Sequence, residues 1–193
     1  MKNLFYLLPI LLLSNSYAKE VDCEKNKVYC RIIEVSPSTD KNFAMQLSNY
    51  IHKYSKQFGT DPMISVAIAM QESSFRNIDK QGSILLSNGR VVRGHTDLGV
   101  FQIHINTIEN LKKEANWNID YFKLRNDVEY QTYWHIRILK RKIETCEKMK
   151  DKLNIENGNE WSCYHSYTYK HRIKYVNDVN RYLVNERVDF TEY

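Results

Sequence analysis

Carboxyl groups and polar side chains come together in two short segments of this 193-residue chain. The segment AIAMQESSF (67–75) contains Glu72, and the segment GHTDLGVFQIHINT (94–107) contains Asp97 and Gln102. A carboxylic acid that keeps its proton near neutral pH can act as a general acid, and its conjugate base can take a proton back. An amide beside it offers a donor and an acceptor to a polar substrate. These segments are therefore candidates for acid–base chemistry.

Glu72 is expected at the C-terminal end of an apolar helix. Asp61 can cap this helix, Pro62 suits its first turn, and the run MISVAIAM follows. Because the run is apolar on most sides, the helix should be central and buried. The negative end of the helix dipole and the loss of hydration both disfavour an ionised carboxyl group there. The sequence therefore predicts a raised pKa for Glu72.

The elements that must position these segments are mostly helical. Only 6 Gly and 3 Pro occur, which disfavours a turn-rich β-sandwich or barrel. Between residues 82 and 94, two apolar runs flank Asn88-Gly89, which is a strong signal for a β-hairpin. The predicted fold class is therefore mainly α (α+β), a helical domain with a small β-hairpin. Apolar residues at helical spacing predict further helices over 43–58, about 105–115, about 127–149 and about 170–186.

Residues 1–18 have the features of a signal peptide. Lys2 supplies a positive start, residues 4–13 (LFYLLPILLL) are apolar, and Ser16-Tyr17-Ala18 presents small residues at a cleavage site. This apolar run is too short for the roughly 20 residues that span a bilayer. We therefore predict cleavage after Ala18, export to the periplasm or the exterior, and no stable membrane insertion of the mature protein.

The four cysteines are Cys23, Cys30, Cys146 and Cys163. An even number of cysteines in an exported chain predicts disulfides, and the absence of a C-x-x-C spacing disfavours zinc or a redox pair. Four cysteines allow three pairings. Proximity in the sequence favours Cys23–Cys30 and Cys146–Cys163, with free structural thiols as the alternative.

Neither a metal, a cofactor nor nucleic acid is expected. The chain has no H-E-x-x-H motif, and His104 and His135 lie in apolar helical patterns that are typical of core histidines. It also lacks the Gly-rich loops that bind nucleotide phosphates. The net charge is +5, but the densest basic run, Lys140-Arg141-Lys142, is interpreted as a solvated helix face.

Tyrosine is abundant, with 14 residues in the chain. Rings with a polar tip suit a groove that handles a polar polymer, although tyrosine also fills helix interfaces. Tyr164 and, beside it, Tyr167 and Tyr169 are candidates for such a groove. Most of the other tyrosines recur at helical spacing and are expected to serve packing.

A third segment, WSCYHSYTYKHRIKYVNDVNRYL (161–183), completes a pattern with the two acidic segments. The three resemble the lytic transglycosylases with a soluble-lytic-transglycosylase (SLT) domain, a branch of the lysozyme-like superfamily. The resemblance covers roughly residues 42–184 and depends most on Glu-Ser-x-Phe followed by Gly-Val-Phe-Gln-Ile. It implies a lysozyme-like fold and cleavage of the MurNAc-GlcNAc β-1,4 bond of peptidoglycan. In that reaction the 6-hydroxyl of MurNAc attacks its own anomeric carbon and leaves a 1,6-anhydro end.

The resemblance also implies roles for individual side chains. Glu72 matches the single acid of the family, which later acts as the base. Ser73 matches a hydroxyl near that acid, and Gln102 matches a glutamine in the substrate groove. Tyr164 matches a tyrosine whose phenol could orient Glu72. The family has Asn after this tyrosine, whereas this chain has His165, a residue that can titrate near neutral pH.

Two other functions stay open. Residues 96–103 also look like the part of animal-type lysozymes that presents a second carboxylate, so Asp97 would make the chain a hydrolytic muramidase. Alternatively, Asp97 holds the hairpin through local hydrogen bonds, and Gln102 bonds the backbone of its own loop. The third function is that of a wall-binding or assembly protein, which would keep the fold with little turnover.

The predicted organisation has four parts. A signal peptide (1–18) precedes an N-terminal stretch with the first two cysteines (19–41), a lysozyme-like transglycosylase domain (42–187) and a C-terminal tail (188–193). The expected partner is the glycan strand of peptidoglycan. For a small exported member, the resemblance adds an expectation of work for a secretion, conjugation or pilus apparatus.

Overall fold

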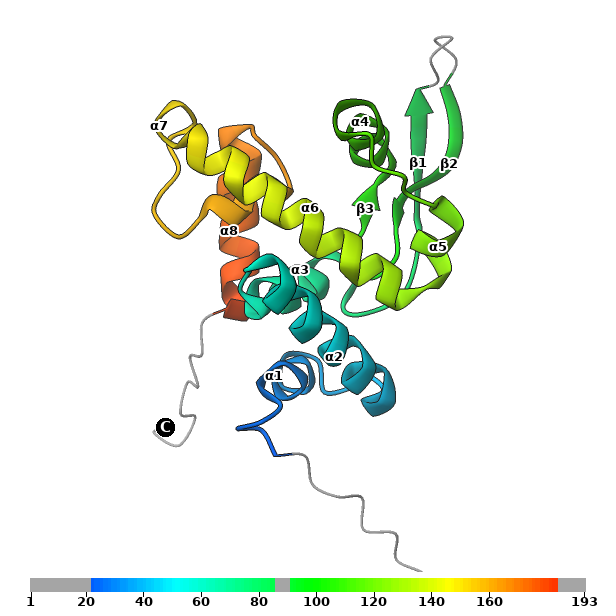
Figure 1. The fold of residues 1–193 in the computed structure, drawn as a ribbon, viewed down its shortest axis with the longest axis vertical. Helices are drawn as coiled ribbons and strands as arrows, with labels where there is room; N and C mark the ends of the chain where they lie inside the picture. The colour runs from blue at the N-terminus through cyan, green and yellow to red at the C-terminus, as the bar shows by residue number, and fades with distance from the viewer. Residues whose placement is uncertain (1–21, 86–90, 184–193) are drawn as a thin grey trace, which may run out of the picture.

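The structure is a computed structural model that describes residues 22–85 and 91–183. The predicted signal peptide (1–18), the predicted Asn88-Gly89 turn and the predicted tail (188–193) lie outside the described residues. The described part is mostly helical and carries one small antiparallel sheet, as Figure 1 shows. The predicted fold class is therefore confirmed.

Capping residues set the bounds of the first predicted helices. Helix α2 (Lys41–Phe58) begins where the Asp40 carboxylate accepts a hydrogen bond from the Phe43 N–H at 2.8 Å. It ends at Gly59, whose φ of 66° lies in the left-handed region that stops a helix. The other predicted helices are α3 (Pro62–Ser73), α4 (Ile105–Ala115), α6 (Val128–Lys148) and α8 (Tyr169–Leu183).

Four helical elements were not predicted from the sequence. Helix α1 carried a readable signal, because Val28, Tyr29 and Ile32 stand at helical spacing, and all three are buried. The others are short, with few apolar positions to show a period. The four are α1 (Lys27–Val35), α5 (Tyr121–Asn126), α7 (Lys150–Leu153) and the 3-10 helix η1 (Glu160–Tyr164).

The sheet contains the predicted hairpin and one further strand. Strands β1 (Lys80–Leu85) and β2 (Val91–Leu98) pair in antiparallel register. A short third strand, β3 (Ile103–His104), pairs with the end of β2 and places Asp97 opposite His104. This pairing folds the chain back after β2, so that the Gly-Val-Phe-Gln segment forms a tight loop at the base of the hairpin.

Helix α3 lies between two apolar clusters. Val66 and Ala69 contact the larger cluster, which includes residues of α1 and α2 and of the loop after β2. Ala67 and Ile68 contact the second cluster, which includes residues of α6, η1 and α8. Figure 1 shows α6 crossing the molecule, with the hairpin and α4 on one side and α7 and α8 on the other. Because α3 is buried on several sides, its C-terminal end is held in a fixed position.

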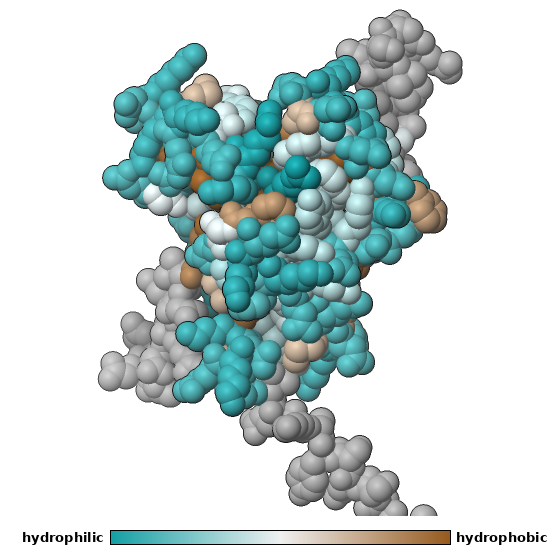
Figure 2. Space-filling view, in the orientation of Figure 1, coloured by the Kyte–Doolittle hydropathy of each residue, from teal (hydrophilic) through white to brown (hydrophobic). Residues whose placement is uncertain are grey.

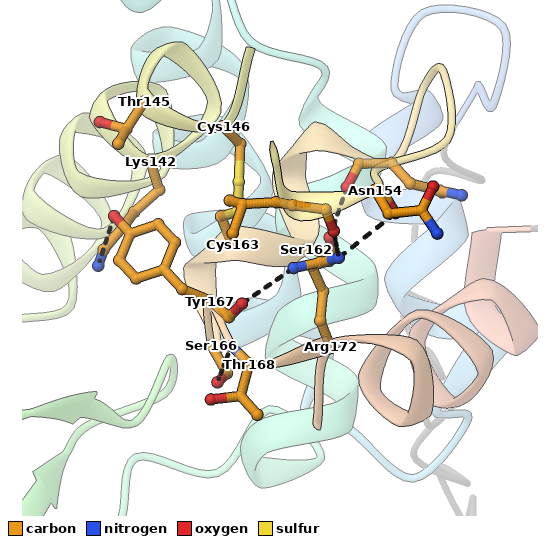
Figure 3. The surroundings of a disulfide bond; sticks show 12 residues. Lys142, Thr145, Cys146, Asn154, Ser162, Cys163, Ser166, Tyr167, Thr168 and Arg172 are labelled. Atoms are coloured by element: carbon orange, nitrogen blue, oxygen red, sulfur yellow. Dashed lines mark hydrogen bonds between the residues drawn. A yellow bond between two sulfur atoms is a disulfide. The ribbon is translucent and has the colours of Figure 1, made fainter. Parts of the chain in front are cut away.

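Both disulfides join the cysteines that are nearest in sequence. The Cα atoms are 5.7 Å apart in Cys23–Cys30 and 6.2 Å apart in Cys146–Cys163. The first pair closes the turn that leads into α1. The second pair is fully buried and ties α6 to η1, as Figure 3 shows.

A buried arginine supports the segment after the second disulfide. Arg172, at the start of α8, is 1% exposed. Its guanidinium donates hydrogen bonds to the backbone carbonyl groups of Tyr167, at 3.1 Å, and of Leu153 (Figure 3). The chain between η1 and α8 is therefore fixed to the end of α7 as well as to α6.

The described residues show neither a membrane span nor a metal cluster. Within 22–85 and 91–183, none of the helices combines the length and the apolar character needed to cross a bilayer. In the same ranges, no three side chains of His, Cys, Asp or Glu gather to hold a metal ion. His104 lies at the N-terminus of α4, where its Nδ1 accepts a hydrogen bond from the Asn106 N–H at 3.0 Å. It is a capping residue and not part of a helical face.

Candidate active site

Glu72 lies in the last turn of α3, where the backbone turns sharply. Ser74 and Phe75 have φ angles of 53° and 59°. Residues with a side chain adopt this left-handed region at a cost of about 1–2 kcal/mol each. The Ser74 N–H donates to the Met70 carbonyl at 2.9 Å, and the Phe75 ring is buried in the core. These contacts stabilise the turn and so fix the direction of the Glu72 side chain.

Ser73 fastens the end of α3 to the second acidic segment. Its hydroxyl donates to the Val100 carbonyl at 2.7 Å and lies 3.2 Å from the Ala69 carbonyl. The side chain is buried, so the hydroxyl bridges the helix and the loop after β2. The hydrogen bonds of the Ser73 hydroxyl are thus to the protein backbone, and its expected place near the Glu72 carboxyl group stays a prediction.

The carboxyl group of Glu72 has an environment that favours its protonated form. Burial raises the pKa of Glu72, and the nearby charge of Asp97 raises it further. A hydrogen bond from the Tyr175 hydroxyl, 2.8 Å from Oε1, and the charge of Lys80 lower it. Burial is the largest of these effects, so Glu72 keeps its proton to a higher pH than an exposed glutamate. A general acid at neutral pH requires this shift.

Glu72 borders a cavity of about 390 Å³. Five of the six residues predicted for the site line this cavity, while Ser73 is buried behind it. The walls come from the end of α3, from β1, β2 and β3, and from α4, α6 and η1. The lining consists of Glu72, Lys80, Asp97, Gln102, Ile103, His104, Thr107, Ile138, Tyr164 and His165.

The loop from Gly99 to Gln102 takes its shape from α6. Gly99 has a φ of 72°, and a Cβ atom there would lie 2.4 Å from the Gln131 side chain, so only glycine fits. Gln131 is fully buried on α6. Its Oε1 accepts the Val100 N–H at 3.0 Å, and its Nε2 donates to the Asn77 side chain at 2.9 Å. One side chain therefore fixes both the loop after β2 and the turn after α3.

Gln102 is buried at the wall of the cavity with a φ of 47°. Its Nε2 donates to the carbonyl groups of Ile78 at 2.6 Å and Gly99 at 2.5 Å. The contact with Gly99 is the bond to its own loop that the sequence left open as an alternative, whereas Ile78 lies in the segment between α3 and β1. Oε1 is buried and has no hydrogen-bond partner among the described residues. Because this oxygen is also screened from solvent, a substrate donor reaches it only if the cavity wall moves.

Tyr164 contacts the loop after β2. Its hydroxyl donates to the Phe101 carbonyl at 3.2 Å, and the hydrogen bond to Glu72 comes from Tyr175. The Phe101 ring stacks on the buried His135, with centroids 3.8 Å apart. His135 lies 3.2 Å from the Ser65 hydroxyl, and burial lowers its pKa to about 3, so it stays neutral. Tyr164 therefore positions the cavity wall through Phe101.

His165 and Tyr175 form a stacked pair at the edge of the cavity. Their ring centroids are 4.4 Å apart and the planes differ by 9°. Burial lowers the pKa of His165, and the charges of His171 and Lys174 act in the same direction. Burial also raises the pKa of Tyr175 far above its usual value, so its phenol remains a donor to Glu72. A neutral His165 thus supports the ring that holds the acid.

Asp97 lies at the wall of the cavity and makes a local hydrogen bond. It lies on β2 and lines the same cavity as Glu72. Its Oδ2 accepts a hydrogen bond from the Thr96 hydroxyl at 2.9 Å, which is a local contact of the hairpin. The carboxylate is therefore held beside its own strand while it faces the cavity.

Three residues of the site were not predicted. Tyr175 lies within the segment quoted for the resemblance, one residue before an apolar position of α8, and its polar tip was the available signal. Gln131 is a polar residue in the apolar pattern of α6, and a buried amide of this kind signals a specific hydrogen-bond role. Lys80, whose Nζ donates to the Glu72 backbone carbonyl at 3.0 Å, had no local signal.

Replacement of Tyr175 by Phe is expected to move the alkaline limb of the pH profile of kcat/KM to higher pH. The Tyr175 hydrogen bond lowers the pKa of Glu72, so its loss raises that pKa and keeps the acid protonated further into the alkaline range. The plateau value of kcat/KM should fall about tenfold, because the Glu72 carboxyl group loses the hydrogen-bond donor that orients it. The measurement is the rate of the expected glycan cleavage as a function of pH.

Tyr169, which the sequence suggested for the groove, does not line the cavity. Tyr169→Phe is therefore the matched control, because it removes the same atom from an exposed residue on the same helix. It should leave the profile unchanged. An alkaline limb that stays in place in Tyr175→Phe would contradict the effect of Tyr175 on the Glu72 pKa.

The fold and the cavity agree with the comparison to known families. One protein-family model, the Transglycosylase SLT domain, matches residues 49–177. Searches of curated proteins and of solved structures found no match. The matched range includes Glu72, every residue that lines the cavity, and Tyr175. The family resemblance predicted from the three segments is confirmed, and because the match spans more than half of the sequence, the chain belongs to the transglycosylase SLT domain family.

Proposed function

We propose that this protein is an exported lytic transglycosylase that uses Glu72 as acid and then as base and forms a 1,6-anhydro product. Membership of the family implies cleavage of the glycan strands of peptidoglycan. The proposal depends on one observation above all, which is the Glu72 carboxyl group with a pKa raised by burial at the wall of a cavity. The two disulfides fit an extracytoplasmic location, and the predicted signal peptide would direct the chain there.

The geometry around Glu72 suits two successive proton transfers. The protonated carboxyl group donates to the glycosidic oxygen as the bond to the anomeric carbon breaks. The resulting carboxylate then takes the proton of the MurNAc 6-hydroxyl as that oxygen attacks the same carbon. Tyr175 donates to Oε1 and stabilises the carboxylate between the two steps, which leaves Oε2 for proton transfer. No water is consumed, so one carboxyl group suffices.

The other predicted residues would hold the sugar or its surroundings. Gln102 offers its unpaired Oε1 to a sugar amide or hydroxyl. Ser73 and Tyr164 fix the loop that carries Gln102, through the carbonyl groups of Val100 and Phe101. These two act as positioning residues in the proposed mechanism. His165 acts in the same way through Tyr175.

Digestion of purified peptidoglycan by the mature protein tests the proposal. Mass spectrometry of the released muropeptides should show 1,6-anhydro ends. Reducing ends formed with added water would contradict the transglycosylase mechanism and support a muramidase. Absence of any released product would support the third function, a wall-binding or assembly protein. A role of this protein in a secretion, conjugation or pilus apparatus stays a prediction that comes from the resemblance.

The hydrolytic alternative is supported by one specific observation, because Asp97 lines the cavity with Glu72 and its charge raises the Glu72 pKa. In a transglycosylase, Asp97→Asn should keep most of the activity. Its alkaline limb should move to lower pH, because the charge that raised the Glu72 pKa is gone. A loss approaching that of a general acid, roughly 10²–10⁴-fold, would favour the muramidase. Initial rates of muropeptide release across pH distinguish these outcomes.

A further inference from the structure

The catalytic cavity adjoins a second cavity that lies between α4 and α6. This second cavity has a volume of about 270 Å³ and shares Thr107 with the first. On α6, Ile138 lines the first cavity and Lys142 lines the second. Since a helix rises about 1.5 Å per residue, Lys142 lies about 6 Å further along α6. The two cavities therefore have Thr107 as a common wall residue, and we call the second cavity the α4–α6 groove.

The α4–α6 groove carries positive charge. Its charged side chains are Glu114, Arg141 and Lys142. Arg141 faces Glu114 at 3.4 Å, whereas Lys142 has no carboxylate partner among the described residues. Figure 2 shows strongly hydrophilic surface in the hollow between the side of α7 and α8 and the side of α4. A cation without a carboxylate partner therefore lies at a concave surface beside the catalytic cavity.

The position of Lys142 is defined by its contacts with Tyr167. Its Nζ donates to the Tyr167 hydroxyl at 3.2 Å and lies 4.5 Å from the centroid of the same ring (Figure 3). The buried Arg172 donates a hydrogen bond to the Tyr167 backbone carbonyl. Tyr167 lies four residues after Cys163, which the disulfide joins to Cys146 on α6. Tyr167 as a whole is 39% exposed. Lys142 and Tyr167 thus present a preformed cation and hydroxyl to the groove.

We infer that the α4–α6 groove binds carboxylate groups of the peptide stems that branch from the glycan strand. This inference rests on the proposed function, because the stems belong to peptidoglycan. The sugars offer hydroxyl and amide groups, which need no cation, whereas the stems carry free carboxylates. A lysine that lacks a carboxylate partner and lies beside a phenol hydroxyl complements such a group. Lys142 is the charge partner, and the Tyr167 hydroxyl is the neighbouring polar contact.

The test compares binding of soluble glycan fragments of equal length with and without their peptide stems. Fluorescence anisotropy is measured with the Glu72→Gln protein, so that no fragment is cleaved. The stem-bearing fragment should bind about tenfold more tightly than the stripped one. Lys142→Gln in the same background should remove this difference, and Lys142→Arg should keep it. Lys140→Gln is the matched control, because Lys140 pairs with Glu144 on the same helix and does not line the groove.

Two results would overturn the inference. One is equal affinity for both fragments, and the other is an equal weakening of both by Lys142→Gln. The proposed function is tested separately by the products of the wild-type protein. The two tests can give different results. If the wild type releases no anhydro product but binding still shows a Lys142-dependent preference for stem-bearing fragments, the transglycosylase mechanism is contradicted and the binding of stems in the α4–α6 groove is supported.

Discussion

Glu72→Gln should lower the rate of glycan cleavage by roughly 10²–10⁴-fold, the usual contribution of a positioned general acid. Glutamine has nearly the same shape as glutamic acid, and its amide oxygen can still accept the hydrogen bond from Tyr175. It cannot give a proton to the glycosidic oxygen or take one from the 6-hydroxyl. The measurement is the initial rate of muropeptide release from purified peptidoglycan by the mature protein.

The stability of the Glu72→Gln variant should match or exceed that of the wild type at neutral pH. Burial raises the pKa of Glu72, so the folded state binds a proton that the unfolded chain has lost. The unfolding free energy of the wild type therefore falls as the pH rises from the unfolded pKa to the raised folded value. Glutamine does not ionise and avoids this loss. Thermal unfolding of both proteins at several pH values measures this difference in stability.

Glu147→Gln is the matched control for activity, because it makes the same chemical change at an exposed position of α6. This variant should cleave glycan at the wild-type rate. Wild-type activity in Glu72→Gln itself would remove Glu72 from the role of acid. A loss of activity together with a lower melting temperature would contradict the expected stability.

Replacement of both Cys146 and Cys163 by Ala should lower the free energy of unfolding by about 3 kcal/mol. The disulfide closes a loop between residues separated by 17 positions, so its removal increases the entropy of the unfolded chain. Chemical denaturation of the oxidised wild type and of the double variant gives the difference. The activity should fall as well, because Tyr164 and His165 directly follow Cys163 at the wall of the cavity.

The double replacement of Cys23 and Cys30 by Ala is the control for this second effect. It removes a disulfide that precedes α1 and whose cysteines do not line the catalytic cavity. This variant should lose stability and keep the wild-type rate of glycan cleavage. Equal losses of activity in the two double variants would contradict a specific role of Cys146–Cys163 at the site.

Local rules in the sequence determined much of the fold. Asp40 and Asp61 each accept a hydrogen bond at the start of a predicted helix, and Gly59 follows the predicted end of α2 at Phe58. The hairpin and the nearest-neighbour disulfides also agree with the sequence. Glu72 lies at the end of a buried helix, and burial raises its pKa. These features depend on residues a few positions apart, whose effects act through the backbone of one element.

The tertiary structure decided which side chains act on Glu72. Tyr175 is 103 residues away in the sequence, yet its hydroxyl lies 2.8 Å from the carboxyl group, whereas Tyr164 contacts Phe101. Gln131 reaches the loop after β2 across 31 residues. Such contacts depend on how α3, α6 and α8 pack, and a periodic pattern shows that a face is buried without showing which partner it meets.

The same limit explains the basic run of α6. The sequence predicted a solvated helix face for Lys140-Arg141-Lys142, but Arg141 and Lys142 line a groove that α4 and Tyr167 complete. Composition and spacing place these charges on one helix, but they do not show which other elements of the fold face that helix. The sequence by itself therefore determined the family, five of the helices and the place of Glu72 at the end of one of them. The tertiary structure decided the hydrogen-bond partner of Glu72 and the groove beside its cavity, because both are formed by elements that are distant in the chain.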